Sequence, residues 1–121
     1  MEKKKILVVD DEVNQGLLYE EELTEEGYEV DVANSGERAL QMVKEKQYDL
    51  VVLDIGMPAM DGLETLGKLL SMDNKLHVIL NTAYPSYKDN FMSWAADAYV
   101  VKSSDLTELK EKIKKSLSGK S

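Results

Sequence analysis

LVVLDIGMPAMDG, at residues 50–62, joins a short apolar run to a loop through one acidic residue, Asp54. Every position from Leu50 to Leu53 is apolar, which is typical of a strand that helices cover on both faces of a parallel sheet. A carboxylate at the end of such a buried strand is costly unless a charged group lies beside it. The rest of the sequence must therefore supply a partner for Asp54.

Similar runs rich in Val, Ile and Leu occur on both sides of this stretch, with helix-like segments between them. The five runs are KILVVDD, YEVDVA, DLVVLD, LHVILNT and DAYVVK, at residues 5–11, 28–33, 49–54, 76–82 and 97–102. Strands that alternate with helical segments of about 10–15 residues indicate βαβ units. The run at 28–33 alternates apolar and charged residues, which suits an edge strand. We therefore expect an α/β fold with a doubly wound five-stranded parallel sheet, (βα)5.

The helical segments differ in how regular their apolar stripes are. In the segment at 13–26, Glu22 falls where a buried leucine is expected. The last helix is better defined, because Asp105 and Glu108 form a capping-box pattern at its start. The stripes, in chain order, are Leu18 and Leu23; Ala39, Leu40 and Val43; Leu63, Leu66 and Leu70; and Leu106, Leu109, Ile113 and Leu117.

Polar side chains end four of the five predicted strands. They are Asp10, Asp11, Asp54, Asn81, Thr82 and Lys102. The carboxyl ends of parallel strands meet at one edge of the sheet, and open α/β sheets bind their ligands there. We therefore expect these side chains to form one site.

The three acids in this set predict a metal site. Asp10, Asp11 and Asp54 would lie on neighbouring strands about 5 Å apart, and three carboxylates so close cannot all stay ionised without a cation. Oxygen-only ligands of this kind suit Mg²⁺. With Lys102 opposite Asp54 and a hydroxyl from Thr82, the set is what phosphoryl transfer to a carboxylate requires.

Taken together, these strands and polar residues resemble the receiver domain of two-component response regulators. The motifs VVDDE, LDIGMPAMDG, NTA and YVVK occur in the order and at the spacing of that family, and the resemblance runs from about residue 4 to 117. It implies one receiver domain over residues 1–121, of the single-domain chemotaxis or relay type. It also implies a flavodoxin-like fold with strand order 2-1-3-4-5.

The resemblance assigns the phosphoryl and metal ligands residue by residue. Asp54 would accept a phosphoryl group from a phosphohistidine on a sensor histidine kinase or a phosphotransfer protein. Asp11 and Asp54 would bind Mg²⁺ directly, together with the backbone carbonyl of Gly56, and Asp10 would hold it through water. The chain would thus be a signalling switch that catalyses only its own phosphorylation and dephosphorylation.

The resemblance also implies how the signal is passed on. Thr82 would swing toward the phosphoryl group, Lys102 would pair with it, and Tyr99 would turn inward behind Thr82. These movements would reshape the face made by the last strand and the helices on either side of it in sequence. That face would then bind a downstream protein.

Three departures from the family pattern bear on this site. Ser103 follows Lys102 where the family usually has a proline joined by a cis bond. Because a cis bond before a non-proline residue costs about 3 kcal/mol, we expect a trans bond here. A trans bond could direct the Lys102 side chain differently from that of the family. Ala95 stands where the family often has glycine. Gly56 and Tyr84 hold the two positions that tune hydrolysis in the family.

Other residues favour structural roles. His77 begins the fourth strand, about 16 Å from the site, and we expect a partly exposed structural histidine that is neither a metal ligand nor a phosphodonor. Tyr84, Tyr87, Phe91 and Trp94 are spaced as one face of a helix. Packing against the sheet is the favoured role of these aromatics, and binding of a partner is the alternative.

The overall composition excludes several classes of protein. A formal charge of −8 argues against direct contact with nucleic acid, which needs a clustered basic surface. The chain has no cysteine, so thiolate metal sites and disulfides are excluded. The apolar runs are too short to cross a membrane, and no secretory signal is recognisable. We expect a cytoplasmic protein.

Two alternative functions remain open from the sequence. One is a scaffold that does not depend on phosphorylation, if the loop after Lys102 has disabled switching. The other is a Mg²⁺-dependent phosphohydrolase with Asp54 as nucleophile. The hydrolase is disfavoured because Gly56 stands where a second acid would be needed, and because no inserted cap encloses a substrate.

Overall fold

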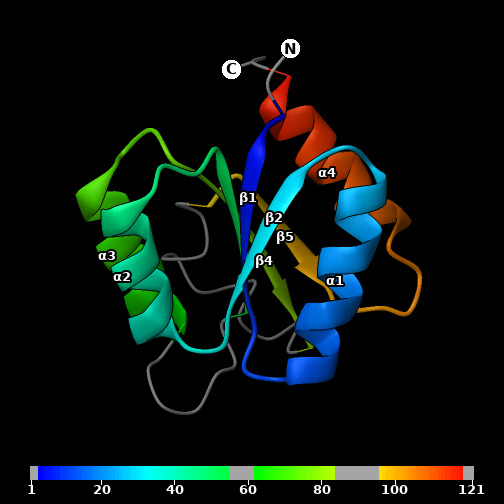
Figure 1. The fold of residues 1–121 in the computed structure, drawn as a ribbon, viewed down its shortest axis with the longest axis horizontal. Helices are drawn as coiled ribbons and strands as arrows, with labels where there is room; N and C mark the ends of the chain where they lie inside the picture. Colours follow the sequence, from blue (N-terminus) through cyan, green and yellow to red (C-terminus); the bar gives the residue numbers. More distant parts are fainter. Residues whose placement is uncertain (1–2, 55–61, 84–95, 119–121) are drawn as a thin grey trace.

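The computed structural model describes residues 3–54, 62–83 and 96–118. Within these ranges the elements follow the predicted alternation of strands and helices (Figure 1). They are β1 (Lys5–Val9), α1 (Val13–Glu25), β2 (Glu29–Ala33), α2 (Gly36–Glu45), β3 (Leu50–Leu53), α3 (Gly62–Met72), β4 (His77–Thr82), β5 (Ala98–Val101) and α4 (Thr107–Leu117). The predicted aromatic helix face from Tyr84 to Trp94 lies outside the described residues, as do Gly56 and Ala95.

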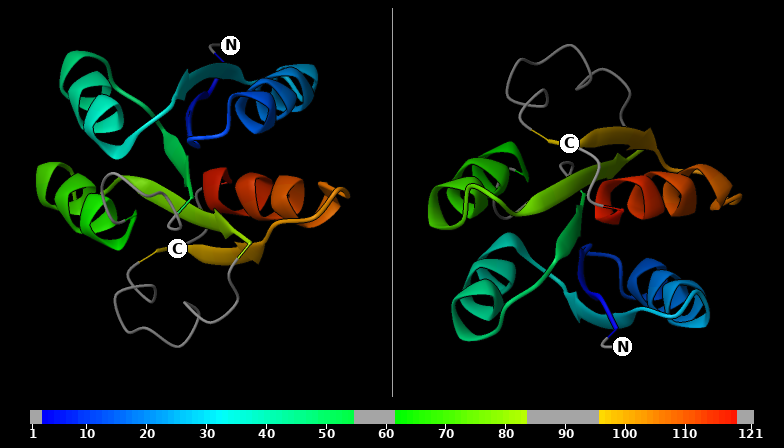
Figure 2. Two further views of the ribbon diagram at one scale, coloured as in Figure 1. Left: turned by 90° about the horizontal axis from the view of Figure 1, so that it is seen from below. Right: turned by 90° about the horizontal axis from the view of Figure 1, so that it is seen from above.

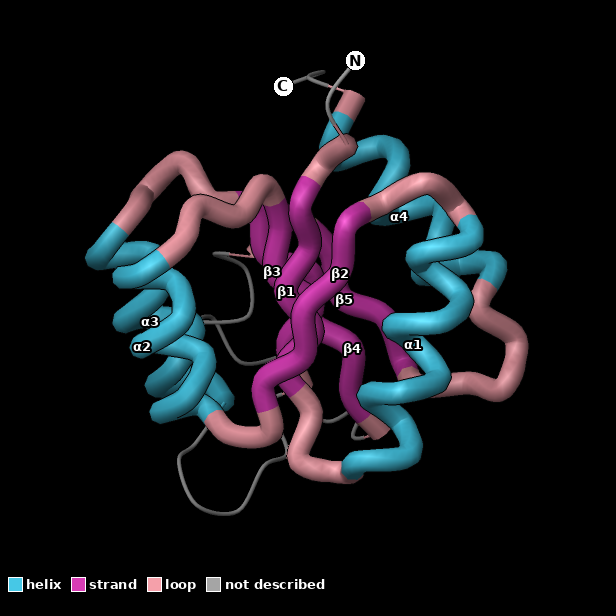
Figure 3. Tube along the Cα trace, viewed as in Figure 1, coloured by secondary structure: helices cyan, strands magenta, loops and turns pink. Residues whose placement is uncertain are grey.

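All five strands are parallel and stand in the order β2-β1-β3-β4-β5, which confirms the predicted topology. Helices α2 and α3 cover one face of the sheet, and α1 and α4 cover the other (Figure 2). Neighbouring residues of β1 point to opposite faces, so Leu7 and Val9 join one core while Ile6 and Val8 join the other. Figure 3 shows the central strands enclosed between these helical layers.

Helix α1 packs through a face of which the apolar pattern indicated only Leu23. Its buried residues are Gly16, Tyr19 and Leu23, at the i, i+3, i+7 spacing of one helical face. The prediction for Leu18 was wrong, since 39% of it is exposed. Gly16 allows the close approach, because a Cβ atom there would lie 2.8 Å from Cγ1 of Val32.

An ion pair explains why Glu22 stands in α1 where a buried leucine was expected. Glu22 is half-buried and accepts a hydrogen bond of 2.8 Å from the Nζ atom of Lys110 in α4. Glu26 lies 3.7 Å from the same amine. The two helices on this face of the sheet therefore meet through charge where a pair of apolar side chains was expected.

The start of α4 differs from the predicted capping box. Asp105 Oδ1 accepts hydrogen bonds from the backbone N–H and the hydroxyl of Thr107, at 2.9 and 2.6 Å. The N-cap position falls on Leu106, which makes no side-chain capping bond. An aspartate can bond the backbone two residues on as readily as three, so the turn begins one residue later than predicted. The apolar stripe is confirmed, with Leu109 and Ile113 buried.

The edge strand β2 is tied to the loop before β3 by a charged network. Asp31 accepts hydrogen bonds from the Tyr48 hydroxyl at 2.7 Å and the Lys46 amine at 2.9 Å. Lys46 also lies 3.3 Å from Glu29. Burial alone would raise the pKa of the Asp31 carboxyl, but the two hydrogen bonds outweigh it and hold that pKa below its usual range.

His77 begins β4 and is partly exposed, as predicted. Its Nδ1 atom lies 2.5 Å from the carboxylate of Asp97, which precedes β5. The backbone N–H of Asp97 donates to the carbonyl of Val78 at 2.8 Å. The pair therefore ties the approach to β5 to the start of β4.

Candidate functional site

The sheet brings three carboxylates together where β1 and β3 end. Val9 and Leu53 are partners in register, so the acids that follow them lie side by side. Asp10 is 1% exposed and Asp54 is 7% exposed, while Asp11 is exposed. Oxygen atoms from all three side chains lie within 4.8 Å of one another.

Backbone hydrogen bonds hold the two buried acids in place. The N–H of Asp10 donates to the carbonyl of Ala33, and the N–H of Asp54 donates to the carbonyl of Val9, each at 3.0 Å. Asp10 Oδ1 also accepts from the N–H of Glu12 at 2.9 Å. The hydrogen bonding between the parallel strands therefore continues one residue past β1 and β3, and it fixes the backbone positions of Asp10 and Asp54.

Lys102 is the partner that the buried carboxylate of Asp54 needs. Its Nζ atom donates to Asp10 Oδ2 at 2.8 Å and to Asp54 Oδ2 at 3.0 Å. Burial alone would lower the pKa of this amine, but the hydrogen bonds and charges of the two carboxylates outweigh it and raise the pKa above its usual range. The lysine therefore stays charged at neutral pH.

The substitution of serine after Lys102 does not turn the lysine away from the site. No cis peptide bond occurs in the described ranges, so the bond to Ser103 is trans, as predicted. The backbone N–H of Lys102 donates to the carbonyl of Thr82 at 2.7 Å, and Ser103 Oγ accepts from the N–H of Asp105 at 3.1 Å. These bonds anchor the backbone on both sides of Lys102. The amine is directed at Asp10 and Asp54 even though the bond to Ser103 is trans.

Thr82 and Tyr99, the two predicted switch residues, lie on neighbouring strands of the sheet. Thr82 ends β4 and is fully buried. Leu80 is the register partner of Tyr99, and side chains two apart on a strand share a face, so Thr82 and Tyr99 lie on the same face of the sheet. Tyr99 is half-buried and packs against the core on that face. Their movement on phosphorylation stays a prediction.

A buried tyrosine beneath the site was missed by the sequence pattern. Tyr19 of α1 is 1% exposed and shares a hydrogen bond with the side chain of Asn81 in β4. Burial raises the pKa of its hydroxyl, and the bond to Asn81 and the charge of Lys102 oppose that rise. Tyr19 lies three residues after Gly16 and four before Leu23, and this helical spacing was the signal in the sequence that could have predicted its burial.

The donor set fits a divalent cation of the Mg²⁺ type. Three carboxylates contribute oxygen atoms only, and within the described part of the chain one ammonium group stands against two of them. Mg²⁺ prefers such oxygen ligands and keeps several waters. The carbonyl of Gly56, the fourth predicted ligand, lies outside the described residues.

An exposed apolar surface adjoins this acidic site. Val13 is 65% exposed and Leu17 is 56% exposed, and both belong to the first turns of α1. A hollow of about 310 Å³ beside them is lined by Asp10, Val13, Leu17, Val32, Asn34 and Arg38. The buried residue Asp10 thus belongs both to the acidic cluster and to the lining of this hollow.

The family model of the response regulator receiver domain matches residues 6–114. The chain belongs to the response regulator receiver family. Sporulation initiation phosphotransferase F of Bacillus subtilis (strain 168) is 35% identical to this receiver over 123 residues, which cover 100% of this chain and 99% of that protein.

Longer regulators share the receiver as one part. The transcriptional regulatory protein PcoR of Escherichia coli is 33% identical over 113 residues, covering 92% of this chain and 50% of PcoR. This receiver therefore spans half the length of that relative. Among the described residues, none of the helices has the length and apolar character needed to cross a membrane.

Solved structures agree with this family. The response regulator TrrA of Thermotoga maritima, in complex with Mg²⁺–BeF, is 53% identical, with a TM-score of 0.90 over 93% of this chain and 98% of TrrA. TrrA has also been solved in complex with the histidine kinase ThkA, with 54% identity and a TM-score of 0.89 over 94% of this chain and 98% of TrrA. This receiver is therefore a two-component signalling domain.

Proposed function

We propose that this receiver is a Mg²⁺-dependent phosphorylation switch in which Asp54 accepts a phosphoryl group from a histidine kinase or a phosphotransfer protein. We also propose that residues 1–121 act as one domain in the cytoplasm and catalyse only their own phosphorylation and dephosphorylation. The observation that carries the proposal is Lys102, whose amine lies within 3.0 Å of Asp54 beside three clustered carboxylates.

The chemistry follows from these positions. A carboxylate oxygen of Asp54 attacks the phosphorus of a phosphohistidine, a P–O bond forms, and the P–N bond breaks with its electron pair leaving on the imidazole. Lys102 then faces the new phosphoryl oxygens, and the Thr82 hydroxyl donates a hydrogen bond to one of them. The backbone of Asp54 is already fixed by the bond from its N–H to the carbonyl of Val9, and its carboxylate by the Lys102 amine, so little reorganisation precedes the attack.

Mg²⁺ would be held by Asp11 and Asp54, with Asp10 reached through water and Gly56 as a further predicted ligand. When bound, it supplies positive charge that neutralises the phosphoryl oxygens in the transition state. The TrrA complex with Mg²⁺–BeF supports this assignment. Thr82 and Tyr99 would couple the phosphoryl group to β5 and its neighbouring helices, and so to a downstream protein.

The scaffold alternative loses its main support from this geometry. It rested on a misdirected Lys102 after the change to Ser103. The amine contacts both buried acids instead, at 2.8 and 3.0 Å. Phosphorylation-dependent switching is therefore the function that the site favours.

The test is the intact mass of the protein after incubation with Mg²⁺ and acetyl phosphate. We expect one added phosphoryl group in the native chain and in the control Asp73→Ala, and none in Asp54→Ala or without Mg²⁺. Since an adduct can hydrolyse during the assay, binding of beryllofluoride with Mg²⁺ is followed by NMR in parallel. Absence of both the adduct and beryllofluoride-induced shifts around Asp54 would leave the scaffold as the better function.

The exposed apolar surface on α1 fits the kinase that delivers the phosphoryl group. The donor must reach Asp54 from outside, and the hollow beside Val13 and Leu17 opens next to that edge of the sheet. The complex of TrrA with ThkA shows that a similar receiver binds a histidine kinase. We therefore assign this surface to the phosphohistidine-bearing partner.

Leu17→Glu separates docking from chemistry. We expect it to slow phosphoryl transfer from a cognate histidine kinase at least tenfold while leaving labelling by acetyl phosphate unchanged. Met72→Glu is the matched control, because Met72 is also an exposed apolar residue but lies at the end of α3. Equal slowing with both donors would assign Leu17 to the fold of the site rather than to docking.

A further inference from the structure

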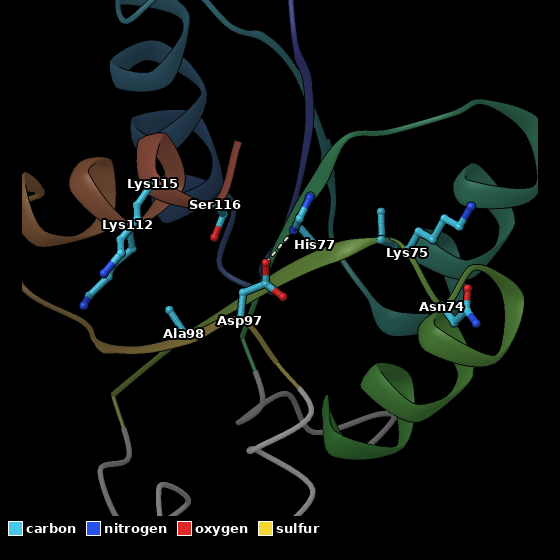
Figure 4. Close-up of a pocket in the computed structure, with 9 residues that line it drawn as sticks. Asn74, Lys75, His77, Asp97, Ala98, Lys112, Lys115 and Ser116 are labelled. Carbon is cyan, nitrogen blue, oxygen red and sulfur yellow. Dashed lines mark hydrogen bonds and ion pairs between the residues drawn. The ribbon is translucent and has the colours of Figure 1, made fainter. Parts of the chain in front are cut away.

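A second hollow lies at the opposite edge of the sheet from Asp54, where β4 and β5 begin. Its volume is about 530 Å³, within the range of small-molecule sites. The lining residues are Asn74, Lys75, Leu76, His77, Asp97, Ala98, Lys112, Lys115 and Ser116. Figure 4 shows Lys112, Lys115 and Ser116 on one side of the His77–Asp97 pair, and Asn74 and Lys75 on the other.

The charges of this hollow are unbalanced. Three lysines, Lys75, Lys112 and Lys115, line it, against the single carboxylate of Asp97. That carboxylate is already bonded to His77. Figure 4 shows that the Lys75 side chain extends away from the His77–Asp97 pair, on the side opposite Lys112 and Lys115. Within the described ranges none of the three lysines forms an ion pair, whereas Lys110 of the same helix pairs with two acids of α1. A positive hollow therefore stands out on a chain whose formal charge is −8.

The chemistry of the lining excludes other classes of ligand. A metal ion would need several free donor atoms, but the imidazole and the carboxylate bond to each other. An extended polyanion would also meet the acidic residues Asp49 and Asp73, which line the adjoining hollow of about 340 Å³. A compact anion avoids those acids and can contact the lysines.

We propose that this hollow binds a phosphorylated small molecule of about nucleotide size, with its phosphate groups held by Lys112 and Lys115. Lysine amines bind phosphate as mobile point charges, so the site needs no rigid fork of donors. The buried side chain of Leu76 and the half-buried Ala98 supply apolar wall for the organic part. The phosphorylation site at the other edge, about 16 Å away along β4, does not take part.

The first experiment is an NMR titration of the native chain with inorganic pyrophosphate, in EDTA so that no divalent cation occupies the acidic site. We expect amide shifts at residues 74–77, 97–98 and 112–116. Lys112→Gln and Lys115→Gln should each weaken binding about threefold to fivefold, the effect of losing one half-exposed ion pair. Lys114→Gln is the matched control, since this exposed lysine lies on the same helix but does not line the hollow.

The outcomes are distinguishable from those for the phosphorylation site. Asp54→Ala should bind pyrophosphate as the native chain does, and raised ionic strength should weaken binding in both. A nucleoside diphosphate should bind at least as tightly as pyrophosphate, and the unphosphorylated nucleoside should not bind. Absence of shifts up to about 10 mM pyrophosphate, shifts confined to Asp10 and Asp54, or equal weakening by Lys114→Gln would each overturn the proposal.

Discussion

Lys102 is the residue that makes the approach of two buried carboxylates tolerable. The side chains of Asp10 and Asp54 are 1% and 10% exposed, and that of Lys102 is 17% exposed. Removing one partner from a buried ion pair costs more than the pair itself contributes, because the remaining charge has lost its water and its partner. The lysine therefore stabilises the fold, in addition to the role toward the phosphoryl group that we propose for it.

Replacing Lys102 with methionine should lower the free energy of unfolding by about 3 kcal/mol without metal, because two adjacent buried carboxylates lose the positive charge between them. Mg²⁺ should restore most of that loss, since a bound cation neutralises the same carboxylates. Urea unfolding with and without Mg²⁺ measures both effects. Mg²⁺ should thus stabilise Lys102→Met more than it stabilises the native chain.

Lys110→Met is the control for that experiment. Lys110 also contacts two acids, Glu22 and Glu26, but they lie between α1 and α4, away from the three clustered carboxylates. Its loss of stability should be the same with and without Mg²⁺. A Mg²⁺-independent loss in Lys102→Met as well would contradict the role given to the lysine charge.

The predicted site residues came together because a parallel sheet fixes where its strand ends meet. Asp10, Asp11, Asp54 and Lys102 each follow a short apolar run, and the topology places them all at one edge of the sheet. The adjacent strands β1 and β3 make the acids neighbours, and the long side chain of Lys102 reaches them from β5. Tyr19 was missed because it sits inside a helix whose most visible leucines face solvent. The site was predicted from polar residues that follow the strands, and this criterion does not detect a residue that reaches the site from a helix.

Helix α1 depends on close contact with β2 at one position. A Cβ atom at Gly16 would lie 2.8 Å from Cγ1 of Val32, whose branched side chain has little freedom to move. The helical propensity gained by alanine, up to about 1 kcal/mol, works in the opposite direction. The overlap costs about 1–3 kcal/mol in a packed core and outweighs that gain.

Gly16→Ala should therefore lower the free energy of unfolding by about 1 kcal/mol. In a Val32→Ala background, where the overlapping methyl group is gone, the same change should be neutral or stabilising. A double-mutant cycle by urea unfolding gives the coupling between the two positions, expected at about 1 kcal/mol or more. Additive effects of the two substitutions would show that α1 does not rest on this contact.

The elements were predicted well where the apolar pattern had one explanation. The five strands were found to within two residues, because each is a run of Val, Ile and Leu. Helix α1 was predicted in the right place, and of its two predicted apolar contacts Leu23 is buried and Leu18 is not. Its packing uses a glycine and a tyrosine, while Glu22 is satisfied by Lys110 from a helix about ninety residues later. A distant partner of that kind cannot be inferred from local periodicity.

The whole molecule responds to acid through carboxylates that are paired in the folded state. The pKa of Asp31 is lowered on folding, so its stabilising effect is present above the unfolded pKa of about 3.9 and is lost as the pH falls through the folded pKa. Tyr48 contributes its hydroxyl hydrogen bond to that carboxylate. Acid should therefore weaken the attachment of β2 before it affects the central strands.

The free energy of unfolding of the native chain should fall between about pH 5 and pH 3, and that of Asp31→Asn should fall less. Tyr48→Phe should show an intermediate slope, because it removes one of the two hydrogen bonds that lower the pKa. Urea unfolding across this pH range gives the three slopes. Parallel curves for the native chain and Asp31→Asn would mean that other carboxylates set the acid response.

The charges on β2 have a further consequence for how these molecules behave together at high concentration. The strand lies at an open margin of the sheet, where unpaired N–H and C=O groups can template pairing with another chain. A second copy that docked there through its own β2 would bring Glu29 and Asp31, which share the single amine of Lys46, against the same two acids, so the excess negative charge opposes the contact. Acidification removes this repulsion, and fibril growth through β2 should then begin at low pH.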